Sequence, residues 1–176
     1  MKTKPSTEYV LLGSVFSGPK HGYEILKFIN SNLGSIWHIA ASQLYSMLKR
    51  LENDRLLDST RKEQLTRPSK RIFSLTPSGK NRFLDWLHSP NRHVRDLRIE
   101  FLAKLFFFRN LSMPGGKDLI KAQINLLEIS RKRLEHNCVN TKDPFARLSI
   151  QFKIESVKAG LSWLSTDAHR YFSNPI

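Results

Sequence analysis

The chain has 176 residues, of which 40% are hydrophobic and 25% are charged, proportions typical of a soluble globular protein that buries a core. It carries 29 Lys and Arg against 15 Asp and Glu, a formal net charge of +14. Residues 1–90 hold 14 basic and 7 acidic side chains and residues 91–176 hold 15 and 8, so the excess is not confined to a tail. This charge favours an acidic partner, either nucleic acid or an anionic membrane.

Cysteine content and hydrophobic runs exclude several classes of protein. The single cysteine, Cys138, rules out an internal disulfide framework and a cysteine-based zinc site, and it fits the reducing cytosol. Residues 1–7 lack the apolar segment of a secretory signal, and no run approaches the roughly eighteen apolar residues of a membrane span. We therefore expect a cytoplasmic protein with no membrane partner and no cofactor.

The chain begins with three predicted helices. The first runs over about 7–16 with Ser6 or Thr7 as its cap, and the second starts near His21 and stops before Gly34. The third runs over 42–53 with Ser42 as N-cap. At about 100° per residue, one side of this third helix is apolar and predicted to be core: Leu44, Met47, Leu48 and Leu51. The other side is polar and turns basic: Ser42, Ser46, Lys49 and Asn53, flanked by Gln43, Tyr45 and Arg50.

A hairpin and a fourth helix follow. Short strands are predicted at 56–57 and 72–75, and the loop 61–71 between them holds five basic residues and one acidic residue. Thr76-Pro77 is a favourable helix start. This order is that of a winged helix-turn-helix, in which a basic loop grips phosphate while an exposed helix meets base edges in the major groove.

The second half predicts helices at 94–110, 117–137 and 144–172. The last two repeat apolar positions at alternating spacings of four and three, the pattern of a coiled-coil seam. We therefore predict a mainly α protein: an N-terminal winged helix-turn-helix with a short two-stranded wing over 1–89, and a C-terminal all-helical, coiled-coil-like dimerisation domain over 90–176. The last helix supplies the predicted dimerisation residues: Ile150, Ile154, Val157, Leu161 and Leu164. An intrachain hairpin that buries this seam without a partner is the alternative.

Several stretches carry a family resemblance, and together they span most of the chain. They are Leu11–Gly13, Gly18–Ile25, Trp37–Tyr45, Leu48–Glu52, Ser74–Gly79, Arg95-Asp96 and Glu100–Phe106. The chain resembles the PadR family of bacterial transcriptional regulators, with a C-terminal helical domain of the virulence-activator type. One departure is Arg55, which stands where the family usually has a glycine in the turn into the first wing strand. A residue other than glycine there must accept an unusual backbone conformation or change the turn.

The resemblance implies a homodimer that binds a roughly palindromic operator in double-stranded DNA, usually as a repressor. It also implies release by a small aromatic or hydrophobic effector. We expect DNA contacts from the start of the second helix, the third helix and the loop: His21, Tyr23, Ser42, Gln43, Tyr45, Ser46, Lys49, Arg50, Arg67, Lys70 and Arg71. Aromatic and basic side chains are the candidates for the effector site, although core packing explains each aromatic singly: Trp37, Trp86, His93, Phe107 and Trp163.

Two other functions are compatible with parts of the sequence. A basic RNA-binding or ribosome-associated protein would use the same charge, but the aromatic residues lie mainly on apolar faces and are poorly placed for base stacking. A metal-dependent nuclease would need a carboxylate cluster such as Asp85, Asp96 and Glu100, and the last two are explained as helix partners of basic residues. The six histidines show no metal-binding spacing, and no catalytic motif is present, so we expect no enzymatic activity.

Overall fold

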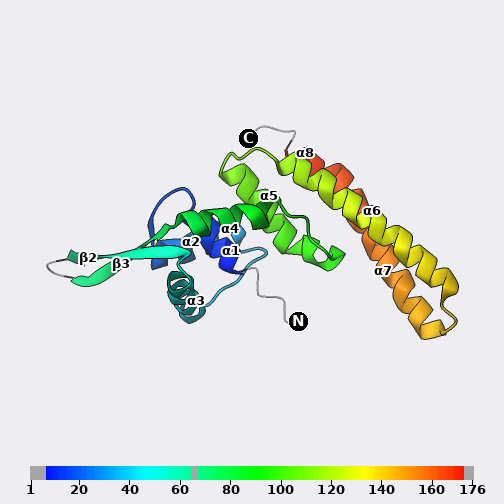
Figure 1. The fold of residues 1–176 in the computed structure, drawn as a ribbon, viewed down its shortest axis with the longest axis horizontal. Coiled ribbons are helices and arrows are strands. Elements are labelled where there is room, and N and C mark those ends of the chain that lie inside the picture. The colour runs from blue at the N-terminus through cyan, green and yellow to red at the C-terminus, as the bar shows by residue number, and fades with distance from the viewer. Residues whose placement is uncertain (1–6, 65–66, 173–176) are drawn as a thin grey trace. The chain divides into compact units, whose positions relative to one another are not determined.

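The computed structural model describes residues 7–64 and 67–172, with side chains described outside 61–70. The chain divides into two compact units, Met1–Leu87 and His88–Ile176 (Figure 1), a division two residues before the boundary expected from the sequence. Among the described helices, none is both long and apolar enough to cross a membrane.

Four helices form the bulk of the first unit: α1 (Thr7–Ser14), α2 (Gly22–Leu33), α3 (Ala41–Asn53) and α4 (Pro77–His88). Helix α1 is central, because nearly all of its residues are buried. It ends two residues earlier than expected, where i→i−3 bonds from Val15 and Phe16 tighten the chain. The expected Ser42 cap is wrong: the Ala40 carbonyl accepts the first helical bond, from Leu44, and Ser42 lies inside the helix.

The described strands form a three-stranded antiparallel sheet in the order β1-β3-β2: β1 (Lys20–His21), β2 (Leu57–Gln64) and β3 (Arg67–Leu75). The expected two-stranded wing is present as the β2–β3 hairpin, but its strands are longer than expected and β1 adds a third strand to the sheet. The β2–β3 hairpin, hereafter the wing, extends into the basic segment because ladder bonds join backbone groups whatever the side chains are. The two residues of β1 pair with Ile72 and Phe73 at the other edge of β3.

The turn from α3 into β2 is fixed by its backbone. Arg55 adopts φ 56, so this chain keeps the left-handed turn without a glycine. The Leu56 N–H donates to the Leu51 carbonyl and the Arg55 N–H to the Glu52 carbonyl, each at 2.9 Å, which is the Schellman arrangement. The Thr76 hydroxyl then donates to the Arg55 carbonyl at 2.8 Å and accepts from the Gly79 N–H at the start of α4.

Gly79 allows α4 to lie against the beginning of the wing. A Cβ at this position would be 2.0 Å from the Leu56 carbonyl oxygen, a distance that no side chain can occupy without moving backbone. The turn, the Thr76 cap and this close approach together hold α3, β2 and α4 in one arrangement.

In the described part of the second unit every secondary-structure element is helical: a 3₁₀ turn η1 (Val94–Arg98), α5 (Glu100–Asn110), α6 (Gly116–Asn140), α7 (Pro144–Trp163), a π segment η2 (Leu164–Ala168) and α8 (His169–Tyr171). The single helix expected over 94–110 is wrong, because Ile99 leaves the helical region at φ −127 and ψ −67. Apolar spacing does not distinguish an α-helix from a short 3₁₀ turn followed by a new helix.

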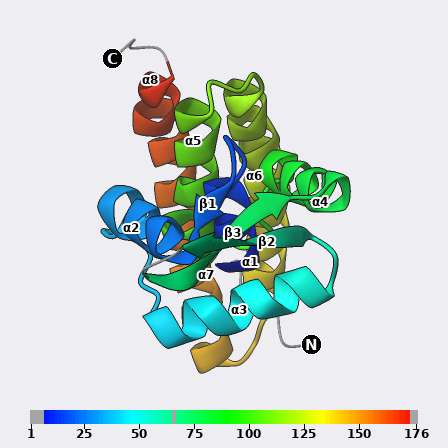
Figure 2. The same cartoon turned by 90° about the vertical axis from the view of Figure 1, so that its left-hand side faces the viewer.

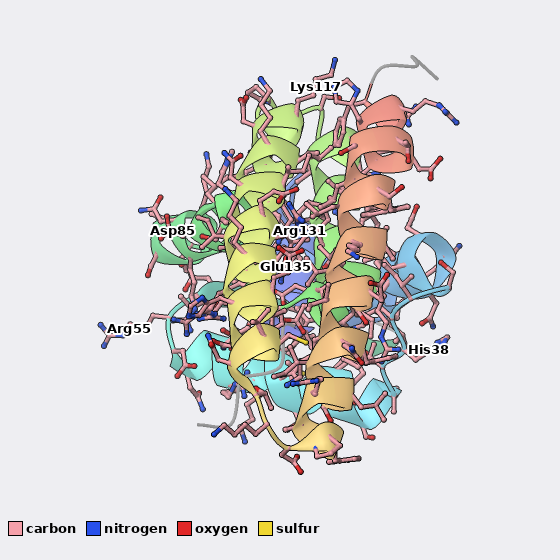
Figure 3. All side chains as sticks on the ribbon, turned by 90° about the vertical axis from the view of Figure 1, so that its right-hand side faces the viewer. His38, Arg55, Asp85, Lys117, Arg131 and Glu135 are labelled. Carbon is pink, nitrogen blue, oxygen red and sulfur yellow. The ribbon has the colours of Figure 1, made fainter. Side chains whose placement is uncertain are left out.

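Helices α6 and α7 lie antiparallel and side by side (Figures 1 and 3). Ile154, Val157 and Leu164 of the predicted seam are buried inside this chain, and Ile150 and Leu161 are half-buried. The intrachain hairpin, which the sequence left open, therefore accounts for this seam in the structure. On α6, Arg131 forms ion pairs with Glu128 at 2.8 Å and with Glu135 at 2.9 Å (Figure 3).

The junction segment 88–91 runs from the last residue of α4 into the second unit, where buried side chains bind its backbone. The buried Gln123 amide accepts from the Asn91 N–H at 2.6 Å and donates to the Asn91 carbonyl at 2.9 Å. The Lys104 ammonium, 2% exposed, donates to the Ser89 carbonyl at 2.7 Å. Burial lowers the pKa of Lys104, an effect that Glu100 at 3.4 Å partly offsets.

Candidate nucleic-acid interface

The polar side of α3 is exposed along its length, whereas its apolar side is buried as predicted. We call Ser42, Gln43, Ser46 and Lys49 the α3 polar face. These side chains supply hydroxyl, amide and ammonium groups, the donors and acceptors that meet base edges in a major groove. Figure 2 shows α3 beside the wing, so the first unit presents an exposed polar helix face and a basic hairpin next to each other.

An ion pair holds the wing to α3. The Arg71 Nη2 atom donates to both carboxylate oxygens of Glu52, at 2.6 and 2.7 Å, and to the Ser59 hydroxyl at 2.7 Å. The hydrogen bond from Ser59, followed by that from Arg71, lowers the pKa of Glu52. Arg71 therefore anchors the wing to α3. If it also contacts phosphate, as expected from the sequence, its guanidinium must bind Glu52 and the phosphate at the same time. The side chains of Arg67 and Lys70, also expected at DNA, lie outside the described residues.

The start of α2 contacts both the wing and α3. The His21 ring donates from Nδ1 to the Arg71 carbonyl at 3.1 Å and stacks on Tyr23 at 5.8 Å. The Tyr45 ring of α3 covers Gly22 so closely that a Cβ there would be 2.6 Å from its Cε1 atom. Tyr23 and Tyr45 remain 52% and 51% exposed, which is unusual for large aromatic side chains and places two phenols next to the α3 polar face.

Arg50, also expected at DNA, is bound to an acidic residue that sequence reasoning missed. Glu8 of α1 is 2% exposed and accepts from Arg50 at 3.1 Å and from Arg82 of α4 at 3.0 Å. The signal was present in the sequence, because Glu8 is the one acidic residue next to the apolar stretch 9–16. Such a residue on a buried helix requires a cationic partner, although the sequence does not say which one.

Comparisons with known proteins agree with this geometry. The profile of the transcriptional regulator PadR-like family matches residues 11–85. The negative transcriptional regulator PadR of Bacillus subtilis is 32% identical over 117 residues, which cover 66% of this chain and 64% of that protein. A crystal structure of Bacillus subtilis PadR in complex with operator DNA has a TM-score of 0.51 and 25% identity, covering 97% of this chain and 99% of that one. Residues 11–85 of this chain are a PadR-like domain.

A probable transcriptional regulator of Mycobacterium tuberculosis is 26% identical over 82 residues, 47% of this PadR-like chain. The matched segments span 64% and 43% of the two curated relatives, less than two thirds of either. The resemblance stated from the sequence is thus confirmed at the level of the family, whose members are transcriptional regulators.

The residues considered for an effector site are divided between the two units of the chain. Trp37 and Trp86 are nearly buried in the first unit, where Trp86 stacks on Tyr9 at 5.1 Å. Phe107 is completely buried in the second unit, and His93 is exposed. Trp163 does border a pocket of about 370 Å³ in the second unit, lined by Val94, Arg95, Leu97, Arg98, Leu102, Ser156, Gly160 and Trp163.

In the described part of this PadR-like chain, no group of three or more His, Cys, Asp or Glu residues is arranged to hold a metal ion.

Proposed function

We propose that this protein is a transcriptional regulator that binds a roughly palindromic operator through α3 and the wing. The observation that carries the proposal is the α3 polar face, which stays exposed because the opposite side of the same helix is anchored in the core. The relative solved with operator DNA supports the same use of the fold. The formal charge of +14 adds attraction to phosphate whatever the base sequence.

Within this surface the residues divide into two roles. The α3 polar face reads base edges, with Gln43 as the residue best suited to a bidentate contact. His21, Tyr23, Tyr45, Arg50, Arg67, Lys70 and Arg71 contact the sugar-phosphate backbone, which sets position and not sequence.

Selection of bound duplexes from a random pool, followed by binding measurements on Gln43→Ala, tests the proposal. The variant is expected to lose about 1–3 kcal/mol on the selected duplex and little on random duplex, because a base contact carries sequence information. Equal losses on both duplexes would contradict the role of Gln43. A protein that selects no duplex, or prefers RNA of equal length in competition, would contradict the function itself.

We further propose that the protein works as a dimer, with a contact surface that differs from the predicted seam. Phe145, Leu148 and Phe152 of α7 are 75%, 61% and 74% exposed, and we call them the α7 apolar stripe. Their spacing of three and four residues places them on the side of α7 opposite the buried Ile154. A second copy of the chain is the occupant that fits, because a palindromic operator needs two α3 helices and three large apolar side chains in solvent favour association.

We infer that the pocket beside Trp163 receives the effector, and that the regulator acts as a repressor released by it. The walls from Val94, Leu97 and Leu102 suit an apolar body, and Arg95 and Arg98 add positive charge at the rim. A small aromatic acid combines both properties. Calorimetric titration with a panel of aromatic acids and neutral aromatic compounds tests this: acids are expected to bind and to lose affinity in Arg98→Ala. Binding that survives Trp163→Ala and Arg98→Ala unchanged would place the effector elsewhere.

A further inference from the structure

Glu8 is a buried carboxylate shared by two arginines that come from distant parts of the chain. Its Oε2 atom accepts from Arg50 Nη2 at 3.1 Å, and its Oε1 atom accepts from Arg82 Nη2 at 3.0 Å. The three residues belong to α1, α3 and α4 of the first unit. The hydrogen bond that Arg82 donates to Glu8 also raises the pKa of Arg82, so this guanidinium stays charged.

The charges in this cluster do not cancel. Two guanidinium groups on one carboxylate leave one positive charge, while Glu8 itself is nearly inaccessible to solvent. The side chains of Arg50 and Arg82 are 44% and 40% exposed, so both cations reach the surface from a buried anchor. Each uses a single Nη2 atom toward Glu8, whereas a guanidinium carries five N–H donors.

The position of Arg50 on α3 relates this cluster to the proposed DNA surface. Arg50 is seven residues after Gln43, which is two helical turns, so Arg50 lies at the same edge of the α3 polar face as Gln43. When a helix lies in a major groove, phosphates run along its flanks, and contacts there fix its register.

We propose that Glu8 is a positioning residue for operator binding, holding Arg50 and Arg82 together as a binding site for a backbone phosphate beside α3. The inference rests on the proposed function and adds two residues, Glu8 and Arg82, to the proposed interface. A guanidinium held in place by a buried carboxylate loses less side-chain entropy when it binds phosphate, and its N–H groups form charge-assisted bonds to the phosphate oxygens.

The test measures the dissociation constant of the selected duplex over a range of salt concentrations. Arg50→Ala and Arg82→Ala are each expected to weaken selected and random duplexes alike, by about tenfold, and to reduce the log–log salt slope by up to about 0.9. Glu8→Gln is expected to weaken binding even though it adds one positive charge. In an Arg50→Ala, Arg82→Ala background, Glu8→Gln is expected to have no further effect, because its targets are gone.

Glu155→Gln is the matched control. Glu155 pairs with Lys158 on α7, so its replacement adds the same charge without touching the cluster, and binding is expected to be unchanged or slightly tighter. Circular dichroism and thermal unfolding establish that each variant is folded at the temperature of the assay. Weaker binding by folded Glu8→Gln that disappears in the arginine-free background supports positioning and not general destabilisation.

Three results distinguish a failure of the proposed function from a failure of the positioning role of Glu8. Wild-type protein that binds no duplex overturns the proposed function. Wild-type protein that binds while folded Glu8→Gln matches Glu155→Gln overturns the positioning role. If Glu8→Gln does not fold, the arginine variants decide: unchanged affinity and salt slope in both Arg50→Ala and Arg82→Ala overturn the inference.

Discussion

Arg55 occupies the left-handed region at the turn between α3 and β2, where glycine has no steric cost. This conformation destabilises an L-residue by about 1–2 kcal/mol. Replacing the residue by glycine removes that strain but costs about 0.5–1 kcal/mol, because glycine has more conformational freedom in the unfolded chain. Arg55→Gly is therefore expected to raise the free energy of unfolding by about 0.5–1 kcal/mol, as measured by urea denaturation. Arg55→Ala removes the same charge but keeps the Cβ, so it should bring no such gain, and equal gains would contradict the backbone explanation.

The elements of the first unit were largely predictable where their side chains alternate between core and solvent. The 3.6-residue period identified both sides of α3, and Thr76-Pro77 located the start of α4. The strand β1 was missed because two polar residues carry no periodic signal, and its pairing partner on β3 is about fifty residues away. The Glu8 cluster was missed for a related reason: its partners lie 42 and 74 residues along the chain, beyond any local pattern.

The attachment of the wing to α3 depends on the ionisation of Glu52. Hydrogen bonds from Ser59 and Arg71 hold the pKa of Glu52 below its ordinary value of 4.5 in the folded protein. Its stabilising contribution is therefore complete above pH 4.5 and is lost as the pH falls through the lower, folded-state value. Glu52→Gln is expected to unfold at a lower temperature than wild type at pH 7, and the difference should shrink below pH 4.5.

Thermal unfolding between pH 7 and pH 3 provides the measurement. Ser59→Ala serves as the companion variant, because removing the principal donor should bring the pKa of Glu52 back toward its ordinary value and start the loss at a higher pH. A difference between wild type and Glu52→Gln that stays constant across this range would show that the carboxylate contributes through packing and not through charge.

For the whole molecule, the dimer proposal predicts different effects for a charge introduced in the α7 apolar stripe and for one introduced in the buried seam. Phe152→Asp places a charge on an exposed position and is expected to yield folded monomers with weak operator binding. Val157→Asp places a charge at a position that is 3% exposed inside the chain and is expected to impair folding itself. Light scattering with size-exclusion chromatography gives the mass, and calorimetry gives the stability. Dimers that persist in Phe152→Asp would remove the stripe from the interface.

The junction segment 88–91 has a practical consequence for exchanging C-terminal units between PadR-like regulators. Its backbone polar groups form hydrogen bonds with the side chains of Lys104 and Gln123. In a hybrid joined directly after Asn91, the backbone groups would come from one parent and the side chains at positions 104 and 123 from the other. Each polar group that is buried and loses its partner would cost about 1–3 kcal/mol. A hybrid whose crossover lies before His88 keeps donor and acceptor from the same parent, and for that reason should be the one that folds.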